Sequence, residues 1–199
     1  MATAVTYQEL LGMEGADLGH SEYITVTQEQ INMFADATND HNWIHIDPER
    51  AASGPFGTPI AHGFLTLSLV IPLWSELLDA TDVDTKVNYG LDKVRFVAPV
   101  PVNSRIRMHA VIDSITEVKG GIQLGVTQTV EVEGSEKPAV VAEDVGNFLQ
   151  ALAQALVQRV DLRQPQGGDE GAHQPVARQV DALAEGAAQH READALAAG

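Results

Sequence analysis

The chain has 199 residues, no cysteine, and a formal net charge of -16 from 12 Lys and Arg against 28 Asp and Glu. The lack of cysteine excludes a disulfide framework, a thiolate metal site and a cysteine nucleophile. The acidic balance argues against nucleic-acid binding, which depends on neutralising phosphates with Lys and Arg. The hydrophobic share of 44% is close to that of ordinary globular proteins, so a core can form.

The first part of the chain predicts a short strand, a helix and a polar loop. Residues 23–26 alternate apolar and polar side chains, which is typical of a strand. Thr27 and Gln30 have the spacing of a capping box, and the helix that they begin ends near Thr38. Residues 39–59 are polar and contain several Gly and Pro, so we expect an irregular loop there.

A long apolar helix is predicted from about Ala61 to Leu78. Its apolar side chains cover most of its circumference, and such a helix is normally enclosed by other elements. Pro72 should kink it near the middle. The segment falls short of the roughly 20 apolar residues that a membrane span needs, and the first ten residues do not have the pattern of a signal peptide. We therefore expect a cytoplasmic protein that does not contact a membrane.

The chain between this helix and Gln150 is predicted to form strands joined by hairpin turns. Alternation of apolar and polar residues places the strands at residues 83–89, 93–97, 105–115, 122–132 and 139–149. Long antiparallel strands with one apolar face need a cover, and the apolar helix is the obvious one. The predicted fold class is therefore α+β, with an antiparallel sheet wrapped around one central helix.

The composition of the chain changes after about Gln150. Residues 151–199 contain no Phe, Trp, Tyr or Ile, and 13 of these 49 residues are alanine. Residues 164–171 have the composition of a flexible linker, and the spacing beyond them allows a short helix. We divide the chain into a domain of residues 1–150 and a tail of residues 151–199. The tail has too little apolar area to offset the entropy of ordering, so we expect it to be flexible; a partner-binding helix is the alternative.

Two features of the sequence carry chemistry. Asp40 and His45 lie five residues apart in the polar loop, where both side chains can curl toward one point. Such a pair can hold and activate a water molecule, although both residues are also common in turns and caps. Gly63 lies in the first turn of the apolar helix, where its N–H can bind a carbonyl oxygen that gains negative charge. Tight packing of the helix start is the alternative explanation for that glycine.

Several motifs resemble those of the MaoC-like dehydratases, the (R)-specific enoyl-CoA hydratases of the hot-dog superfamily, and in particular the nodulation-protein-N-like subgroup. The resemblance extends over about residues 7–150 and does not include the tail. Asn39 and Trp43 depart from the general family, which has Gly and Pro there, but Trp43 fits the subgroup. The motifs are Asp40-His41-x-Trp43-Ile44-His45-x-Asp47-Pro48-Glu49-Arg50-Ala51, Pro55-Phe56-Gly57, Ala61-His62-Gly63-Phe64-Leu65-Thr66-Leu67-Ser68-Leu69 and Asn88-Tyr89-Gly90-Leu91-Asp92-Lys93-Val94-Arg95-Phe96.

This resemblance implies a hot-dog fold and the hydration of a trans-2-enoyl thioester, or the reverse dehydration of a 3-hydroxyacyl thioester. It implies that Asp40 and His45 are the catalytic pair. From the chemistry of hydration we expect Asp40 to be the base and His45 to be the proton donor. The resemblance implies that the Gly63 N–H polarises the thioester carbonyl, with His62 and Asn42 as further substrate-binding candidates. It also implies a CoA or acyl-carrier thioester as substrate, a homodimer, and no cofactor.

Three alternatives stay open at this point. A hot-dog acyl-thioesterase would place its carboxylate on or near the central helix, where Glu76 is the only acid. A non-catalytic acyl-thioester-binding protein would have kept the fold alone. A metal site is the third alternative, although no metal is expected. Its nominal ligands would be Asp40, His41, His45, Asp47 and His62.

The phosphates of a CoA or acyl-carrier substrate would need basic partners, which are scarce in this acidic domain. Five basic residues cluster in sequence and are the candidates; ordinary exposed strand positions are the alternative explanation for them. They are Lys86, Lys93, Arg95, Arg105 and Arg107.

Overall fold

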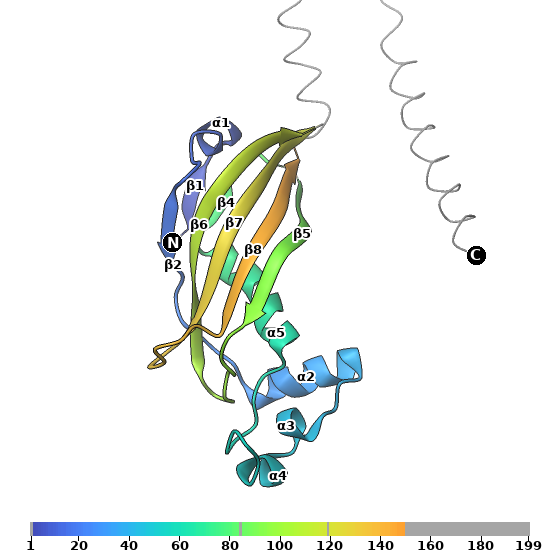
Figure 1. The fold of residues 1–199 in the computed structure, drawn as a ribbon. Coiled ribbons are helices and arrows are strands. Elements are labelled where there is room, and N and C mark those ends of the chain that lie inside the picture. The colour runs from blue at the N-terminus through green and yellow to red at the C-terminus, as the bar shows by residue number, and fades with distance from the viewer. Residues whose placement is uncertain (1, 84, 119, 150–199) are drawn as a thin grey trace, which may run out of the picture. The chain divides into compact units, whose positions relative to one another are not determined.

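The computed structural model describes residues 2–83, 85–118 and 120–149. Its main sheet is antiparallel, with the strand order β2-β6-β7-β8-β5 and with β3 also paired to β6 (Figure 1). A separate parallel pair joins β1 (Thr3–Val5) to β4 (Leu78–Ala80). The strands of the main sheet are β2 (Asp17–His20), β3 (Ile24–Thr25), β5 (Thr85–Phe96), β6 (Arg105–Val118), β7 (Gly121–Val132) and β8 (Val140–Leu149).

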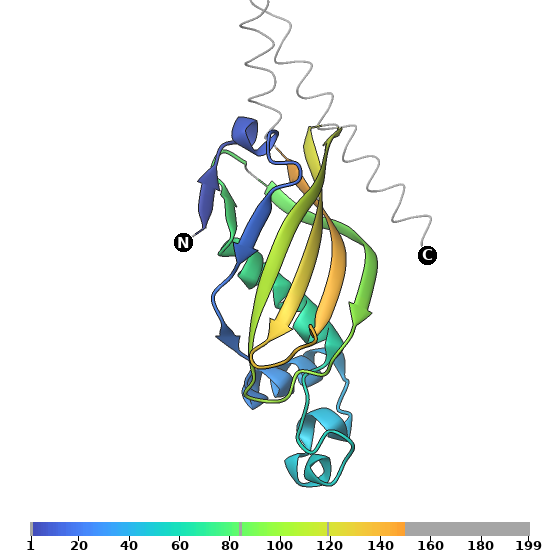
Figure 2. The same ribbon diagram turned by 60° about the vertical axis from the view of Figure 1, so that its left-hand side comes forward.

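Two consecutive helices, α5 (Gly63–Ser68) and α6 (Val70–Ser75), lie across one face of this sheet (Figures 1 and 2). The sheet presents its apolar residues to them, as the alternation along β7 shows. Every second residue of β7 is buried, and the residues between are partly exposed. The buried row is Ile122, Leu124, Val126, Gln128, Val130 and Val132. The predicted α+β arrangement of a sheet around a central helical segment is confirmed.

The central helical segment differs from the predicted helix in two respects. It is interrupted at Leu69, because Pro72 has no N–H to donate to Ser68 and its ring crowds that carbonyl. It ends at Ser75, so the prediction of a helix to Leu78 is wrong. The residues that follow form β4, whose pairing with the start of the chain buries Leu78 and Ala80.

The predicted enclosure of the central helix is also wrong within this chain. Phe64 is 68% exposed and Ile71 is 45% exposed, so the side of the helices that faces away from the sheet core is not covered. The helical segment therefore has one buried face and one apolar face in contact with solvent.

The strand predictions are confirmed in position but not in number. The two strands expected at residues 83–89 and 93–97 are one strand, β5. Its register against β8 shifts between Asn88 and Gly90 and again between Leu91 and Lys93. These irregularities bend the strand without ending it, and for this reason the alternation breaks in sequence where the strand does not.

Four short helices complete the described fold. α1 (Tyr7–Leu10) follows β1, and α2 (Gln28–Thr38) begins at Thr27 with both bonds of the predicted capping box. α3 (Trp43–Ile46) and α4 (Pro48–Ala52) lie within the segment predicted as an irregular loop. α2, α3 and α4 gather at one end of the sheet, next to the start of α5 (Figures 1 and 2).

Two further predictions concern the membrane and the tail. Among the described residues, no helix combines the length and the hydropathy that a membrane span requires. The tail predicted for residues 151–199 lies outside the described residues.

Candidate functional site

The segment that carries Asp40 and His45 is shaped by two local caps. Asn39 ends α2 in the left-handed conformation, with φ of 57°, which Asn tolerates better than most residues. Asn42 begins α3, and its Oδ1 accepts a hydrogen bond from the Ile44 N–H at 3.3 Å. The side chain of Asn42 therefore supports the helical turn that carries His45, three residues further on.

The His45 ring is buried and held in one tautomer. Its Nδ1 lies 2.7 Å from the carbonyl oxygen of Ile60. Because a carbonyl only accepts, Nδ1 carries the proton and Nε2 keeps a lone pair in the neutral ring. Burial lowers the pKa of His45, and His62 lowers it further, against the opposing effects of the Ile60 hydrogen bond and of Asp40. The neutral ring with a free Nε2 is thus the favoured form.

The side chain of His62 contacts both Asp40 and His45, and the residue is 3% exposed. Its Nε2 donates to the backbone carbonyl of Asp40 at 2.9 Å, and its ring stacks on that of His45 with centroids 3.8 Å apart. Phe34 covers it from α2, with ring centroids 5.0 Å apart. The Nδ1 atom of His62 is buried and finds no hydrogen-bond partner among the described residues. His62 therefore connects the Asp40 segment to the His45 ring.

The ligand atoms of Asp40, His45 and His62 all lie within 4.8 Å of one another. These three residues could offer one oxygen and two nitrogens to a divalent cation. Nδ1 of His45 and Nε2 of His62 are bonded to backbone carbonyls, so one nitrogen of each ring remains for a ligand. The same carboxylate and imidazole can also hold a water molecule between them by hydrogen bonds.

The other two nominal metal ligands are occupied elsewhere. His41 bonds the Asp36 carboxylate through Nε2 at 2.8 Å. Asp47 begins α4 and accepts a hydrogen bond from the Arg50 N–H at 3.0 Å. These two residues serve local structure and do not join the Asp40 and His45 side chains.

A cavity of about 270 Å³ opens beside the pair, lined by His45 and Gly63. Its other walls are mostly apolar and include Phe56 and Phe96. Gly63 is the first residue of α5, so its N–H has no acceptor inside the helix. A Cβ at this position would lie 3.0 Å from the Phe96 ring, so the glycine keeps the space between helix and ring open.

The basic residues suggested for phosphate binding are mostly paired with acids. Carboxylates lie within 3.1 Å of four of the five, whereas Arg95 donates to the carbonyl of Val94. The four ion pairs are Lys86–Asp79, Lys93–Glu143, Arg105–Glu133 and Arg107–Glu131.

Glu76, the carboxylate that a thioesterase would use, lies outside this site. It follows the end of α6, and its Oε2 accepts a hydrogen bond from the Glu22 N–H at 2.9 Å. It does not line the cavity that holds His45.

Reasoning from the sequence missed the way the site is supported. The contact of His62 with the backbone of Asp40 spans 22 residues, and neither partner stands in a local motif that predicts it. The anchoring of His45 on Ile60 is similarly remote. The signal that was present is the placement of His62 directly before the helix start, beside the glycine that lines the cavity.

Comparisons with known proteins agree with this architecture. Residues 11–134 match the model of the family described as MaoC like domain. The 3-hydroxyacyl-thioester dehydratase Z of Mycobacterium tuberculosis (strain ATCC 25618 / H37Rv) is 49% identical over 150 residues, covering 75% of this chain and 99% of that protein. Nodulation protein N of Rhizobium leguminosarum bv. viciae is 48% identical over 132 residues, covering 64% and 81% of the two chains.

Among solved structures, the (R)-hydratase from A. caviae involved in PHA biosynthesis aligns with a TM-score of 0.55 and 25% identity. The alignment covers 65% of this chain and 95% of that structure. The resemblance suggested by the motifs, including the nodulation-protein-N-like subgroup, is confirmed. The chain belongs to the MaoC-like family and has its hot-dog fold.

Proposed function

We propose that the protein is a hydro-lyase that interconverts a trans-2-enoyl thioester and an (R)-3-hydroxyacyl thioester. One observation carries the proposal: Asp40 and His45 meet beside an apolar cavity that Gly63 also lines. The cavity suits an acyl group, the pair suits a water molecule, and the glycine offers a backbone donor. The name of the 49% identical relative supports the same reaction.

The thioester carbonyl would bind at the start of α5. Addition of water to the double bond places negative charge on the thioester oxygen as an enolate develops. A donor fixed at that position stabilises this charge more than it stabilises the substrate, and this difference lowers the barrier. The N–H of Gly63 is the donor that we assign to this oxygen.

The pair would hold the water and move its proton. The Nε2 lone pair of neutral His45 accepts a hydrogen bond from water, and the Asp40 carboxylate accepts a second one. One water proton passes to Nε2 as oxygen bonds the β-carbon, and the imidazolium then delivers a proton to the α-carbon. This assignment reverses the division that we expected from the sequence, in which Asp40 is the base. The reason is that Nδ1 of His45 holds the proton against the Ile60 carbonyl, and the lowered pKa of His45 favours the neutral ring.

His62 and Asn42 enter this proposal as positioning residues. His62 donates to the carbonyl of Asp40 and stacks on His45, so it fixes both members of the pair. Asn42 caps the turn that carries His45. Their side-chain contacts favour this supporting role over the direct substrate contact that was expected of them.

A spectroscopic assay separates this reaction from its alternatives. Crotonyl-CoA and longer enoyl-CoA substrates lose their conjugated absorbance on hydration, and a thiol reagent detects any free CoA. We expect absorbance loss without thiol release, abolished in Asp40→Asn. Thiol release would indicate a thioesterase, and binding without turnover across the chain-length series would indicate a non-catalytic acyl-binding protein.

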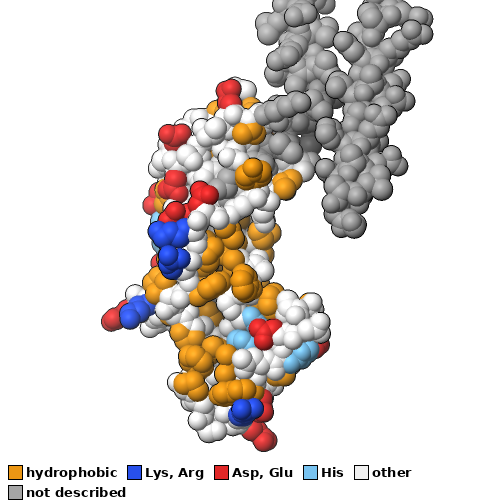
Figure 3. Space-filling view, turned by 45° about the vertical axis from the view of Figure 1, so that its right-hand side comes forward, with side chains coloured by type: hydrophobic (Ala, Val, Ile, Leu, Met, Phe, Trp, Pro, Cys, Tyr) orange, Lys and Arg blue, Asp and Glu red, His pale blue; other side chains and the backbone are white. Residues whose placement is uncertain are grey.

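A second part of the proposal is that two copies of the chain form a homodimer. β5 lies at the end of the strand order and pairs with β8 on one side, which leaves a strand edge of 12 residues among the described strands. A long unpaired edge is a template for another strand. Large exposed apolar side chains surround it and form a band that Figure 3 shows along this face. We call this surface the seam: Phe64, Ile71, Val87, Tyr89, Leu91, Phe96 and Val97.

Pairing of β5 with β5 of a second copy would satisfy the edge and cover the seam. It would also supply the enclosure that the apolar helices lack within one chain. Sedimentation of the full-length protein tests this proposal, and a monomer at micromolar concentration would contradict it.

A further inference from the structure

A polar pair, of which Gln128 is buried and Asp144 is partly exposed, interrupts the apolar face of the sheet beneath α6. Gln128 stands in the row of β7 that is otherwise apolar and is 2% exposed. Its Nε2 donates to Oδ2 of Asp144 on β8 at 3.1 Å. Its Oε1 is buried and has no hydrogen-bond partner among the described residues. A buried amide that is only half satisfied is costly, so its presence in a core row calls for a functional reason.

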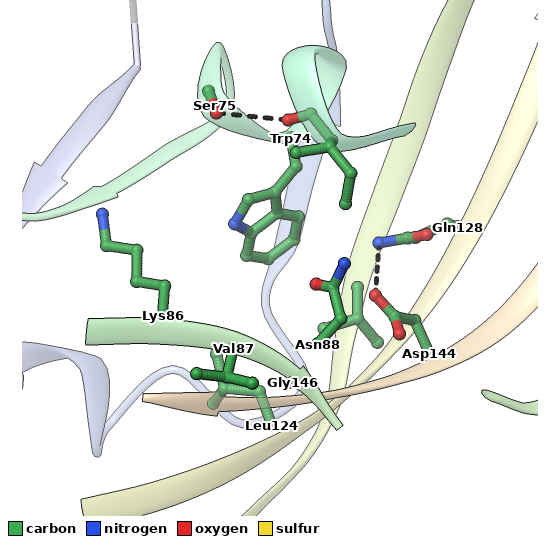
Figure 4. Close-up of a pocket in the computed structure, with 11 residues that line it drawn as sticks. Trp74, Ser75, Lys86, Val87, Asn88, Leu124, Gln128, Asp144 and Gly146 are labelled. Carbon is green, nitrogen blue, oxygen red and sulfur yellow. Dashed lines mark hydrogen bonds between the residues drawn. The ribbon is translucent and has the colours of Figure 1, made fainter. Parts of the chain in front are cut away.

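This pair borders a hollow of about 210 Å³ between α6 and β5, which we call the far hollow. Figure 4 shows the amide of Asn88 and the carboxylate of Asp144 directed into the same space, next to the Trp74 ring. The remaining walls are mainly apolar and include Ile71 and Leu124. Ser75 and Lys86 also line it, and Lys86 forms an ion pair with Asp79. The far hollow therefore offers several polar groups within a mainly apolar space.

The far hollow continues toward the cavity that His45 and Gly63 line, which we call the catalytic cavity. A second hollow of about 330 Å³, which we call the middle hollow, lies along α5 and β5. It shares Ile71, Asn88 and Asp144 with the far hollow. Phe64 lines this middle hollow and meets the ring of Phe96, which lines the catalytic cavity, edge to face at 5.7 Å. The contact between these two rings thus joins a wall of the catalytic cavity to a wall of the middle hollow, which together with the far hollow forms a groove along both helices.

The length of this groove fits an acyl chain. Gly63, at the catalytic cavity, and Ser75, at the far hollow, are 12 residues apart in α5 and α6. At about 1.5 Å per residue, the two positions are roughly 18 Å apart along the helices. A medium to long acyl chain spans such a distance, whereas a four-carbon chain would end inside the catalytic cavity.

We propose that the far hollow is a subsite for a hydroxyl group carried on the acyl chain, remote from the thioester. This inference rests on the proposed function, because it specifies the substrate class of the same site. The Asp144 carboxylate accepts hydrogen bonds, and the amides of Asn88 and Gln128 can donate or accept them. A hydroxyl both donates and accepts, so it matches this set. A plain methyl end would displace water from these groups without replacing its hydrogen bonds.

A second copy bound at the seam would cover this groove from the solvent side. The acyl chain would then lie between the sheet, the helices of one copy and the surface of the other. Covering the groove would strengthen the hydrogen bonds in the far hollow, because they would be removed from water.

Calorimetric binding of two ligands of equal length tests the proposal on the full chain. The probes are dodecanoyl-CoA and its ω-hydroxy counterpart, which are saturated and therefore not turned over. We expect the wild type to bind the hydroxylated probe about tenfold more tightly, the effect of one well-placed hydrogen bond. Gln128→Leu, which continues the apolar row, should remove this preference.

Gln123→Leu is the matched control, because Gln123 lies on the same strand and on the opposite face of the sheet. This variant should keep the preference. Asn88→Ala is a second test variant that keeps the experiment decisive if Gln128→Leu does not fold, because Asn88 is exposed. It should reduce the preference for the hydroxylated probe about threefold. Equal affinity of the wild type for both probes, or a preference that survives both Gln128→Leu and Asn88→Ala, overturns the proposal.

The readout does not depend on turnover, so the two proposals can fail separately. Lack of hydration of any plain enoyl-CoA would contradict the proposed reaction and would leave the binding comparison valid. Normal hydration without any preference for the hydroxylated probe would contradict the subsite alone.

Discussion

The catalytic end of the molecule and the seam differ in how many of their side chains find partners within one chain. At the catalytic end, His45 and His62 each bond a backbone carbonyl from a distant part of the chain, and Asn42 caps the turn that carries His45. At the seam, Tyr89 is 69% exposed and Phe64 is 68% exposed. Under the proposed function, the proton-transfer groups are preorganised in the single chain, whereas the proposed second copy would complete the surface for the rest of the substrate.

The largest expected effect comes from the pair itself. Asp40→Asn and His45→Ala should each lower kcat by about 10²–10⁴-fold, the usual contribution of a positioned acid–base group. His41→Ala is the control, since His41 is exposed and bonds Asp36. Circular dichroism should show the same fold in all three variants. An Asp40→Asn variant with the kcat of the wild type would show that the Asp40 carboxylate does not take part in the reaction.

Charge placed on the seam should break the dimer. The double variant Tyr89→Asp with Leu91→Asp would bury like charges opposite each other, which costs several kcal/mol, so we expect the dimer to weaken at least about a hundredfold. Analytical ultracentrifugation measures this change. Met33→Asp is the control because Met33 is also a large exposed apolar residue but lies on α2, outside the seam.

Gly63→Ala tests how the two regions meet. The added Cβ would lie 3.0 Å from the Phe96 ring, and overpacking of this kind costs about 1–3 kcal/mol. If the Phe96 ring cannot move aside, the strain should displace the start of α5 from its binding position, and kcat/KM should fall by about 5–150-fold. Phe96→Leu in the same chain should restore most of the loss, and Phe96→Leu alone serves as the reference. A loss that Phe96→Leu does not relieve would place the cause at the helix start and not at the ring.

Variants of His62 separate its two contacts. His62→Phe keeps a ring that can stack on His45 and removes the bond to the Asp40 carbonyl, whereas His62→Gln keeps a donor and removes the stack. Loss of one such hydrogen bond should lower kcat about tenfold and change KM little. Because His62 contributes to the lowered pKa of His45, the acid limb of the rate profile should also move to higher pH in His62→Phe. An unchanged profile would leave His62 with a purely structural role.

The smallest expected effect is the pH dependence of the wild type. The pKa of His45 is lowered from 6.5, so the ring stays neutral and active somewhat below that pH. In the unfolded chain His45 takes up its proton near pH 6.5, before the folded ring does. The free energy of unfolding should therefore fall as pH decreases from about 6.5 toward the lower folded pKa. Urea titrations above and below pH 6.5 should show a smaller fall in His45→Gln.

Local patterns in the sequence predicted the elements that local chemistry controls. The capping box at Thr27, the alternation of β6 and β7, and the effect of Pro72 all follow from residues close in the chain. The end of α6 did not follow, because β4 is fixed by pairing with residues 3–5. Its pairing partner lies at the other end of the sequence, so no window around residue 78 reveals it.

The sequence indicated which residues form the candidate site. It did not indicate the tautomer of His45 or the burial of His62. The spacing of Asp40 and His45 and the position of Gly63 indicated the chemistry. The tautomer of His45 depends on the carbonyl of Ile60, and the burial of His62 depends on Phe34. Gln128 looked like any residue of an alternating strand, since only the fold shows which face of β7 is buried.

The two tryptophans of the chain lie in α3 and α6. Trp43 lies in the turn that carries His45, with the Arg50 guanidinium 4.5 Å above its ring, and Trp74 borders the far hollow. The catalytic end and the far hollow therefore each have their own intrinsic fluorophore. With Trp43→Phe the emission would report the arrival of an acyl tail in the far hollow, and with Trp74→Phe it would report changes in the turn that carries His45. Stopped-flow fluorescence of these two variants would time these two events separately.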